Sequence, residues 1–290
     1  QKPEELEIQA LRDGDRIEPF EAVLTVTGPY QSFGFLEGII DGILARRTSI
    51  ATNVYDVIQA AGVSGKQKPI IFMGDRDDHF MQQAGDGYAA YIGGSQAQAT
   101  HAMNEWWGVK GMGTMPHALI QLFKGDVVVA AEAYHVTFPE DDLIVLVDYN
   151  NDVITDALRV ARHFGEALKG VRIDTSRTMV DQYFIRNPEV MGSFDPRGVN
   201  AELVCALRRA LDAEGFGHVQ IVVSGGFDKD RILMFEREGV PVDMYGVGAS
   251  LLKINIGFTG DNVLLNGEHC AKAGRKLNPN PRLEKVAYKV

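Results

Sequence analysis

The sequence predicts an α/β fold built on a parallel sheet that curls toward a barrel. Short apolar runs alternate with amphipathic helical segments through the second half of the chain, which is typical of repeated βα units. Two of these runs, 219–223 and 242–245, lead directly into the glycine turns 224–226 and 246–248. The last two such turns of an α/β barrel frequently share one phosphate, so a barrel accounts for this pair better than an open sheet does.

Composition limits the class of protein. A chain of 290 residues with 45% hydrophobic content can bury a full core, as one large domain or as one large and one small domain. A net charge of -10 and a pI near 5.2 argue against a nucleic-acid or anionic-membrane surface. The two cysteines, Cys205 and Cys270, have no metal-ligand spacing, and no apolar stretch is long enough to span a bilayer. We therefore expect a cytoplasmic protein.

The first half of the chain mixes strand and helix signals. Residues 21–27 alternate like a half-buried strand, and apolar residues at helical spacing in 30–44 and 49–61 predict a pair of helices. A compact apolar run at 69–74 predicts a buried strand, followed by a charged loop. Beyond it the pattern predicts a helix at 85–91, a helical stretch at 97–107 and a short strand at 109–112.

The second half is more regular. Strands are predicted at 143–147 and 170–174, with an amphipathic helix at 152–168 between them. Asn200 is a typical cap for a helix over 201–213, which precedes the two strand-and-glycine units. The tail from Asn262 is expected to be a terminal extension.

Polar residues end the predicted strands, where α/β folds place their functional groups. Asp148 ends one strand, and Arg172 and Asp174 alternate with apolar residues, so both side chains point to the same side of the next strand. Two interpretations stay open. Arg172 and Asp174 form a buried ion pair, or Arg172 holds a planar carboxylate while Asp174 or Asp148 stabilises positive charge or holds ribose hydroxyls.

Three further features are candidates for chemistry. His117 begins an apolar run after Pro116, which suits a structural histidine, a general base, a phosphate ligand or a phosphoryl acceptor. Arg76 lies among aspartates, where ion pairing and anion binding are equally compatible with the sequence. The glycines of the two turns either only provide the backbone conformation that a turn needs or also offer backbone N–H groups to a phosphate. Their residues are Ser224, Gly225, Gly226, Gly246 and Gly248.

Five motifs occur in the order of a known family. They are Gly-Thr-Met-Pro-His at 113–117, Leu-Val-Asp at 146–148, Gly-Val-Arg-Ile-Asp-Thr at 170–175, Val-Ser-Gly-Gly-Phe at 223–227 and Tyr-Gly-Val-Gly-Ala at 245–249. With these motifs the chain resembles a nicotinate phosphoribosyltransferase, and most of all the compact, archaeal-like branch of that family. Further matches at 27–31, 91–94 and 271–275 extend the resemblance over nearly the whole chain.

The resemblance implies an incomplete α/β barrel of the type II phosphoribosyltransferases joined to a smaller α/β sandwich domain. Residues 1–29 would be the remainder of the sandwich domain, residues 30–258 the barrel, and residues 259–290 an extension that packs back on the N-terminal domain. It also implies a head-to-tail homodimer or higher oligomer, with active sites at the subunit boundary.

The implied reaction joins nicotinate to 5-phosphoribosyl-1-pyrophosphate, giving nicotinate mononucleotide and pyrophosphate. The implied catalytic residues are His117, Asp174 and Asp148, and Arg172, Arg76, Thr114 and Thr175 would bind substrate. The two glycine turns would hold the 5-phosphate. Mg²⁺ would accompany pyrophosphate rather than occupy a site made of side chains alone, and ATP would phosphorylate His117.

The chain also departs from the family pattern. Asp77 stands where the second arginine of a pair is expected, and Thr175-Ser176-Arg177 replaces the commoner Ser-Gly-Asp. The chain opens at Gln1, so we expect upstream residues, including the family segment whose aromatic side chain stacks on the pyridine ring.

The alternative functions are a quinolinate phosphoribosyltransferase, a non-catalytic paralogue that binds phosphoribosyl ligands, and a barrel aldolase. Asp77 favours the paralogue, and the lack of a strand-end lysine disfavours the aldolase.

Overall fold

The chain groups into two compact units in a computed structural model that describes residues 5–192 and 194–287. One unit consists of residues 52–253, and the other of residues 1–51 together with 254–290. The domain boundaries expected from the sequence, after residues 29 and 258, stay predictions.

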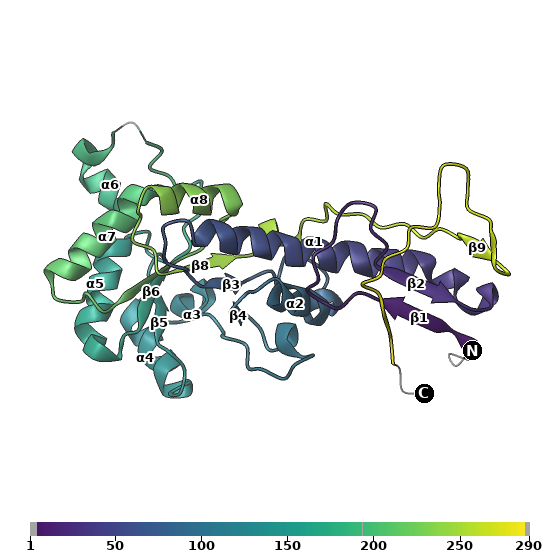
Figure 1. The fold of residues 1–290 in the computed structure, drawn as a ribbon. Helices are drawn as coiled ribbons and strands as arrows, with labels where there is room; N and C mark the ends of the chain where they lie inside the picture. Colours follow the sequence, from purple (N-terminus) through teal and green to yellow (C-terminus); the bar gives the residue numbers. More distant parts are fainter. Residues whose placement is uncertain (1–4, 193, 288–290) are drawn as a thin grey trace. The chain divides into compact units, whose positions relative to one another are not determined.

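The larger unit is built on a parallel sheet of six strands in the order β4-β3-β8-β7-β6-β5. The strands are β3 (Ile70–Phe72), β4 (Ala97–Gln98), β5 (Ile144–Leu146), β6 (Gly170–Ile173), β7 (Gln220–Val223) and β8 (Met244–Val247). The sheet curls into half a barrel with helices packed along it (Figure 1). The predicted incomplete α/β barrel is therefore confirmed.

Helices connect consecutive strands of this sheet. They are α2 (Gln83–Ile92), α3 (His117–Leu122), α4 (Val127–Thr137), α5 (Val153–Phe164), α6 (Gln182–Arg186), α7 (Ala201–Ala213) and α8 (Lys229–Arg237). Four of them begin at a side chain that accepts a backbone N–H: Asp126 caps α4, Asp181 caps α6, Asn200 caps α7, and Asp228 caps α8. The predicted cap at Asn200 is thus confirmed.

The strands run through the core, because every residue of β3 and β6 and three of the four residues of β7 and of β8 are buried. All four residues of β6 are buried, and the exposed fractions of Val171 and Ile173 are 0%. Arg172 lies in register with Leu146 of β5 and Val222 of β7. The alternation along β6 therefore directs Arg172 to the face opposite Val171 and Ile173.

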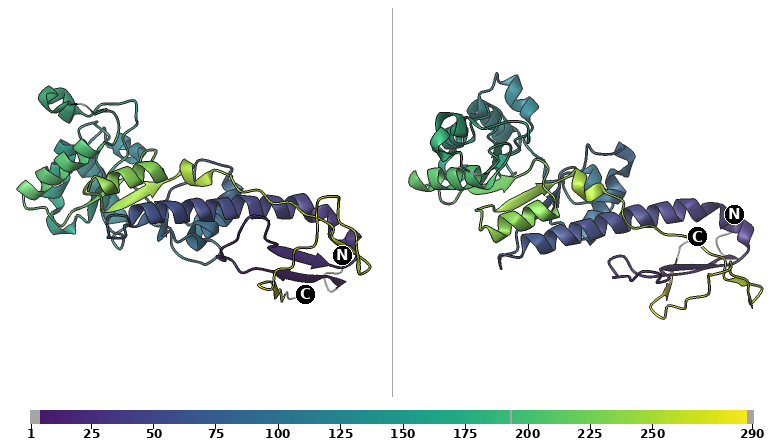
Figure 2. Two further views of the ribbon diagram at one scale, coloured as in Figure 1. Left: turned by 45° about the horizontal axis from the view of Figure 1, so that its top comes forward. Right: turned by 90° about the horizontal axis from the view of Figure 1, so that it is seen from above.

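The first half of the chain differs from the prediction at three places. The expected helix pair is a single helix, α1 (Glu37–Ala61), preceded by the 3₁₀ turns Tyr30–Ser32 and Gly34–Leu36. Figure 2 shows this helix unbroken from two further sides. No glycine or proline interrupts residues 43–61, so nothing in that stretch ends the helix.

The stretch 97–107 is also not a continuous helix. It begins with β4, which pairs with Ile71 and Phe72 of β3, and contains only a 3₁₀ turn at Ala102–Asn104. Residues 109–112 do not form a strand, although Met112 donates to the carbonyl of Gln98. Pairing with the sheet outweighs the local helical pattern here.

The smaller unit contains an antiparallel sheet in the order β11-β1-β2. Its strands are β1 (Glu7–Ala10), β2 (Leu24–Thr27) and β11 (Glu284–Lys285), and β2 is the shortened form of the strand expected at 21–27. A hairpin of β9 (Leu264–Leu265) and β10 (Glu268–His269) precedes β11. Across the described residues, none of the helices combines the length and apolar character that crossing a bilayer requires.

Candidate active site

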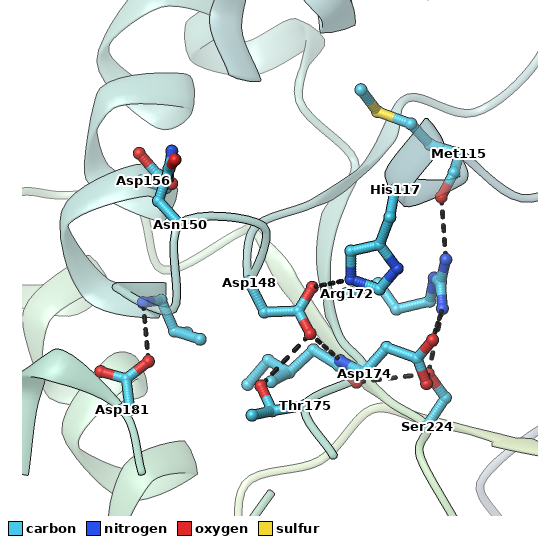
Figure 3. A network of polar contacts seen from close by, with 12 residues as sticks. Met115, His117, Asp148, Asn150, Asp156, Arg172, Asp174, Thr175, Asp181 and Ser224 are labelled. Carbon is cyan, nitrogen blue, oxygen red and sulfur yellow. Dashed lines mark hydrogen bonds and ion pairs between the residues drawn. The ribbon is translucent and has the colours of Figure 1, made fainter. Parts of the chain in front are cut away.

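A buried arginine lies at the centre of the polar residues that end the strands (Figure 3). Arg172 is 7% exposed, and its Nη1 donates to Oγ of Ser224 at 3.1 Å while its Nη2 donates to the carbonyl of Met115 at 2.8 Å. Nη1 also lies 3.3 Å from Oδ2 of Asp174. The ion pair that was one of the two interpretations of the sequence is therefore present, and it is part of a larger network.

Ser224 joins the first glycine turn to the end of β6. Its hydroxyl donates to Oδ1 of Asp174 at 2.8 Å and accepts from Arg172, and its backbone N–H donates to the carbonyl of Ile173 at 2.9 Å. These contacts fix the turn directly above the Arg172–Asp174 pair.

Asp148 links the ends of β5 and β6 to helix α3. Its Oδ1 lies 3.0 Å from Nε2 of His117, and its Oδ2 accepts from the backbone N–H of Asp174 at 3.1 Å and from the hydroxyl of Thr175 at 3.2 Å. The hydrogen bond to Asp148 raises the pKa of His117, against the opposing effect of partial burial. The carboxylate thus favours the protonated imidazole and fixes which ring nitrogen faces it.

A cavity of about 360 Å³ opens beside Arg172. Its apolar wall includes Ile71, Ile144 and Val222 from three strands, and Thr114 lines it from the loop before α3. The lining as a whole is more polar than apolar, but the apolar wall together with a guanidinium suits a small planar ligand that carries a carboxylate. The other lining residues are Met73, Lys110, Gly111, Met112, Gly113, Met115, Tyr134, Glu140, Asp141 and Asp142.

The first glycine turn follows β7, and the expected turn 246–248 lies beside it but is only partly a turn, because Gly246 and Val247 are the last two residues of β8 and only Gly248 follows the strand. Gly225 and Gly226 have φ values of 86° and 73°, which strain any residue with a Cβ. Within the described residues, the backbone N–H groups of these two glycines donate to no protein acceptor. A Cβ added to Gly246 would lie 3.1 Å from Cβ of Ser224, so the end of β8 directly adjoins the first turn.

The predicted site residues fall into two groups. His117, Asp148, Arg172, Asp174, Thr175 and Ser224 form one connected network (Figure 3). Arg76 is an exposed residue of the loop after β3 and takes no part in that network. Its neighbour Asp77 lies beside the second turn, with Oδ2 3.0 Å from the position of a Cβ on Gly248.

Sequence reasoning missed two arginines at the first glycine turn. Nη2 of Arg177 donates to the carbonyl of Gly226 at 2.9 Å, and Nη1 of Arg231 donates to the carbonyl of Gly225 at 3.0 Å. One signal in the sequence could have identified Arg231: it lies in the first turn of α8, three residues after the cap Asp228, and is therefore close to the glycine turn that precedes this helix. Across the described residues, no group of three or more histidine, cysteine or acidic side chains could hold a metal ion.

Comparison with known proteins gives no match to a family model. The chain is 26% identical over 249 residues to the nicotinate phosphoribosyltransferase of Bacillus subtilis, covering 84% of this chain and 45% of that protein. It is 29% identical over 252 residues to nicotinate phosphoribosyltransferase pncB1 of Mycobacterium tuberculosis, covering 85% of this chain and 50% of that protein. The chain spans about half the length of the curated relatives that it matches.

Solved structures share the fold. The structure of nicotinate-nucleotide pyrophosphorylase from Pyrococcus furiosus matches with a TM-score of 0.79 and 29% identity, covering 97% of this chain and 68% of that one. Human nicotinic acid phosphoribosyltransferase matches with a TM-score of 0.61 and 19% identity, covering 84% and 55% of the two chains. These matches confirm the resemblance to nicotinate phosphoribosyltransferases and the fold of the type II phosphoribosyltransferases.

Proposed function

We propose that the protein transfers the phosphoribosyl group of 5-phosphoribosyl-1-pyrophosphate to nicotinate, in the biosynthesis or salvage of NAD. The products are nicotinate mononucleotide and pyrophosphate. The observation that carries the proposal is the buried guanidinium of Arg172, which lines a cavity with an apolar wall and lies beside a glycine turn with unused N–H groups. The names of the curated relatives agree with it.

Arg172 is the proposed partner of the nicotinate carboxylate. A guanidinium has five N–H donors in a planar fork, and the contacts with Ser224, Met115 and Asp174 use only part of them. At 7% exposure the charge is poorly screened by water, so a carboxylate in the cavity would gain a strong charge-assisted interaction. The apolar wall of the cavity would contact the faces of the pyridine ring.

Asp174 and Asp148 are the proposed stabilisers of the reacting sugar. Breaking the bond between ribose C1 and the pyrophosphate oxygen builds positive charge on the ribose, and the pyridine nitrogen then forms the new bond to C1. A carboxylate aimed at the developing charge lowers the barrier. Asp174 is only partly buried, with 20% of its side chain exposed, so a ligand can reach it.

The proposed phosphate sites lie at the two glycine turns and in the loop after β3. The N–H groups of Gly225 and Gly226 and the second turn at Gly246 and Gly248 would hold the 5-phosphate. Arg76 would meet the pyrophosphate from its exposed position. Mg²⁺ brought by the pyrophosphate would take its ligands mainly from phosphate oxygens and water, which is its usual preference.

His117 is the proposed phosphoryl acceptor for ATP. Its Nε2 faces Asp148, so once Nδ1 has released its proton to water the lone pair of Nδ1 can form a bond with the terminal phosphorus of ATP as ADP departs. We further propose a cytoplasmic enzyme that works as a homodimer or higher oligomer.

The test is a pyrophosphate-release assay with phosphoribosyl pyrophosphate and, in turn, nicotinate, nicotinamide and quinolinate. We expect release with nicotinate only. Release with quinolinate only would replace the proposal by a quinolinate phosphoribosyltransferase.

Asp77 beside the second turn favours one further candidate, a non-catalytic protein that binds phosphoribosyl ligands. Calorimetric binding of phosphoribosyl pyrophosphate without release in any assay would establish that candidate.

A further inference from the structure

Two arginines converge on the first glycine turn. Arg177, from the loop after β6, donates through Nη2 to the carbonyl of Gly226 at 2.9 Å, and its Nε lies 3.8 Å from the position of a Cβ on that residue. Arg231, from the first turn of α8, donates through Nη1 to the carbonyls of Gly225 at 3.0 Å and of Gly226 at 3.4 Å, and through Nη2 to the carbonyl of Val199. The turn thus has its carbonyls occupied and its N–H groups unused.

Neither guanidinium forms an ion pair with a carboxylate within the described residues. Burial and the nearby charge of Arg177 lower the pKa of Arg231 to about 10, with the attraction of Asp228 opposing them, so Arg231 stays charged at neutral pH. Its guanidinium carbon lies 4.2 Å from the centre of the Phe227 ring, which excludes water from that side. Partly buried positive charge without a paired acid favours an anion at this turn.

Arg177 is the arginine that can reach such an anion. It is exposed, and the one hydrogen bond to Gly226 leaves most of its five donors available. The loop around it is well defined, since Met179 donates to the carbonyl of Ser176, and Gly198 donates to the carbonyl of Met179. A Cβ on Gly198 would lie 3.1 Å from Cα of Arg177, so this close packing fixes the backbone from which the side chain extends.

A negative charge borders the neighbouring turn. Oδ2 of Asp77 lies 3.0 Å from the position of a Cβ on Gly248. A phosphate shared by the two turns would be repelled from that side, and a cation on the other turn would offset the repulsion. Arg177 is placed to supply that cation.

We propose that Arg177 binds the phosphate of the sugar substrate directly at the Gly225–Gly226 turn. This inference rests on the proposed function for the identity of the sugar. It assigns the Arg177 guanidinium to the 5-phosphate and not to the pyrophosphate.

The test compares Arg177→Gln and Arg177→Lys with the wild-type protein and with the control Arg197→Gln. Arg197 is an exposed arginine of a neighbouring segment that pairs with Asp195, so its replacement removes the same charge away from the turn. Calorimetry measures the Kd of ribose 5-phosphate and of inorganic pyrophosphate for each protein, and thermal denaturation verifies folding. We expect Arg177→Gln to weaken ribose 5-phosphate binding at least about tenfold and pyrophosphate binding less than about twofold. The lysine variant should fall between, and the control should match wild type.

The outcomes separate this inference from the proposed function. Wild-type affinity for ribose 5-phosphate in Arg177→Gln, equal losses for both ligands, or no binding of ribose 5-phosphate to wild type would each overturn the inference, even in a protein that makes nicotinate mononucleotide. A selective loss in a protein that does not use nicotinate would keep the inference and remove the proposed function.

Discussion

Replacing Arg172 by glutamine is expected to remove most of the preference for nicotinate over nicotinamide. The two compounds differ in the carboxylate that Arg172 is proposed to contact, and a charge-assisted hydrogen bond contributes about 1.5–3 kcal/mol. Arg172 is 7% exposed, so little of this is lost to screening. At about 1.4 kcal/mol per factor of ten, the ratio of kcat/KM for nicotinate to that for nicotinamide should fall about 10- to 100-fold.

The assay measures pyrophosphate release at varied concentrations of each base under saturating phosphoribosyl pyrophosphate. Arg172→Lys keeps the charge but loses the planar fork, so its ratio should lie between those of wild type and Arg172→Gln. Arg208→Gln is the matched control, because the Arg208 side chain is 17% exposed and donates to the carbonyls of Val219 and Phe216, away from the cavity lining.

Loss of Arg172 also removes the counter-charge of Asp174, which keeps only its hydrogen bond from Ser224, and takes the guanidinium donor from the carbonyl of Met115, so stability falls. The ratio of kcat/KM for nicotinate to kcat/KM for nicotinamide does not depend on the fraction of enzyme that is folded, whereas kcat per total protein does. An unchanged ratio in a folded Arg172→Gln protein would refute the assignment of the carboxylate to Arg172.

Three other substitutions test neighbouring parts of the account. Because the pKa of His117 is raised, its bond to Asp148 stabilises the fold below pH 6.5, and that contribution is lost as pH rises through the folded-state pKa. Asp148→Asn should therefore move the NMR titration of His117 to lower pH, and an unmoved titration would contradict this cause. Gly225→Ala should lower the free energy of unfolding by about 1–2 kcal/mol and weaken binding of ribose 5-phosphate, because φ is 86° and the new Cβ would lie 3.3 Å from the backbone of Asp174. Wild-type melting and binding would show that the turn tolerates a side chain. Glu236→Gln leaves the mostly buried Lys68, 2.6 Å away, without its counter-charge. Denaturant titration should then show a free energy of unfolding lower by about 3 kcal/mol with kcat little changed, whereas a wild-type midpoint would contradict a structural role for the pair.

The parallel sheet and the edge that carries the candidate site could be predicted because the relevant signals are local. Residues 170–173 and 220–223 are short apolar runs bounded by turn residues, and the alternation around Arg172 fixes the face that it occupies. The network among Arg172, Asp174 and Asp148 follows from the rule that parallel strands end at one edge. The prediction split helix α1 into two helices, because the spacing of apolar residues does not by itself show whether a helix continues between two amphipathic stretches.

The remaining parts of the site depend on contacts between distant segments. Arg177 and Arg231 meet at one turn although 54 positions separate them in the numbering, and no local pattern links a loop arginine to a helix arginine. The two-residue strand β4 forms only because β3 lies beside it, since so short a segment has no periodicity of its own. The position of Asp77 next to Gly248 is likewise a consequence of the pairing of β3 with β8.

The central claim is that the strand ends hold a sugar phosphate and an aromatic acid so that the two react. Phosphorus and proton NMR of one reaction containing phosphoribosyl pyrophosphate, nicotinate and Mg²⁺ measures both products together. The account predicts nicotinate mononucleotide and pyrophosphate in equal amounts, with neither formed when nicotinate is omitted. Pyrophosphate formed alongside free ribose 5-phosphate, or no change in either substrate, would contradict it.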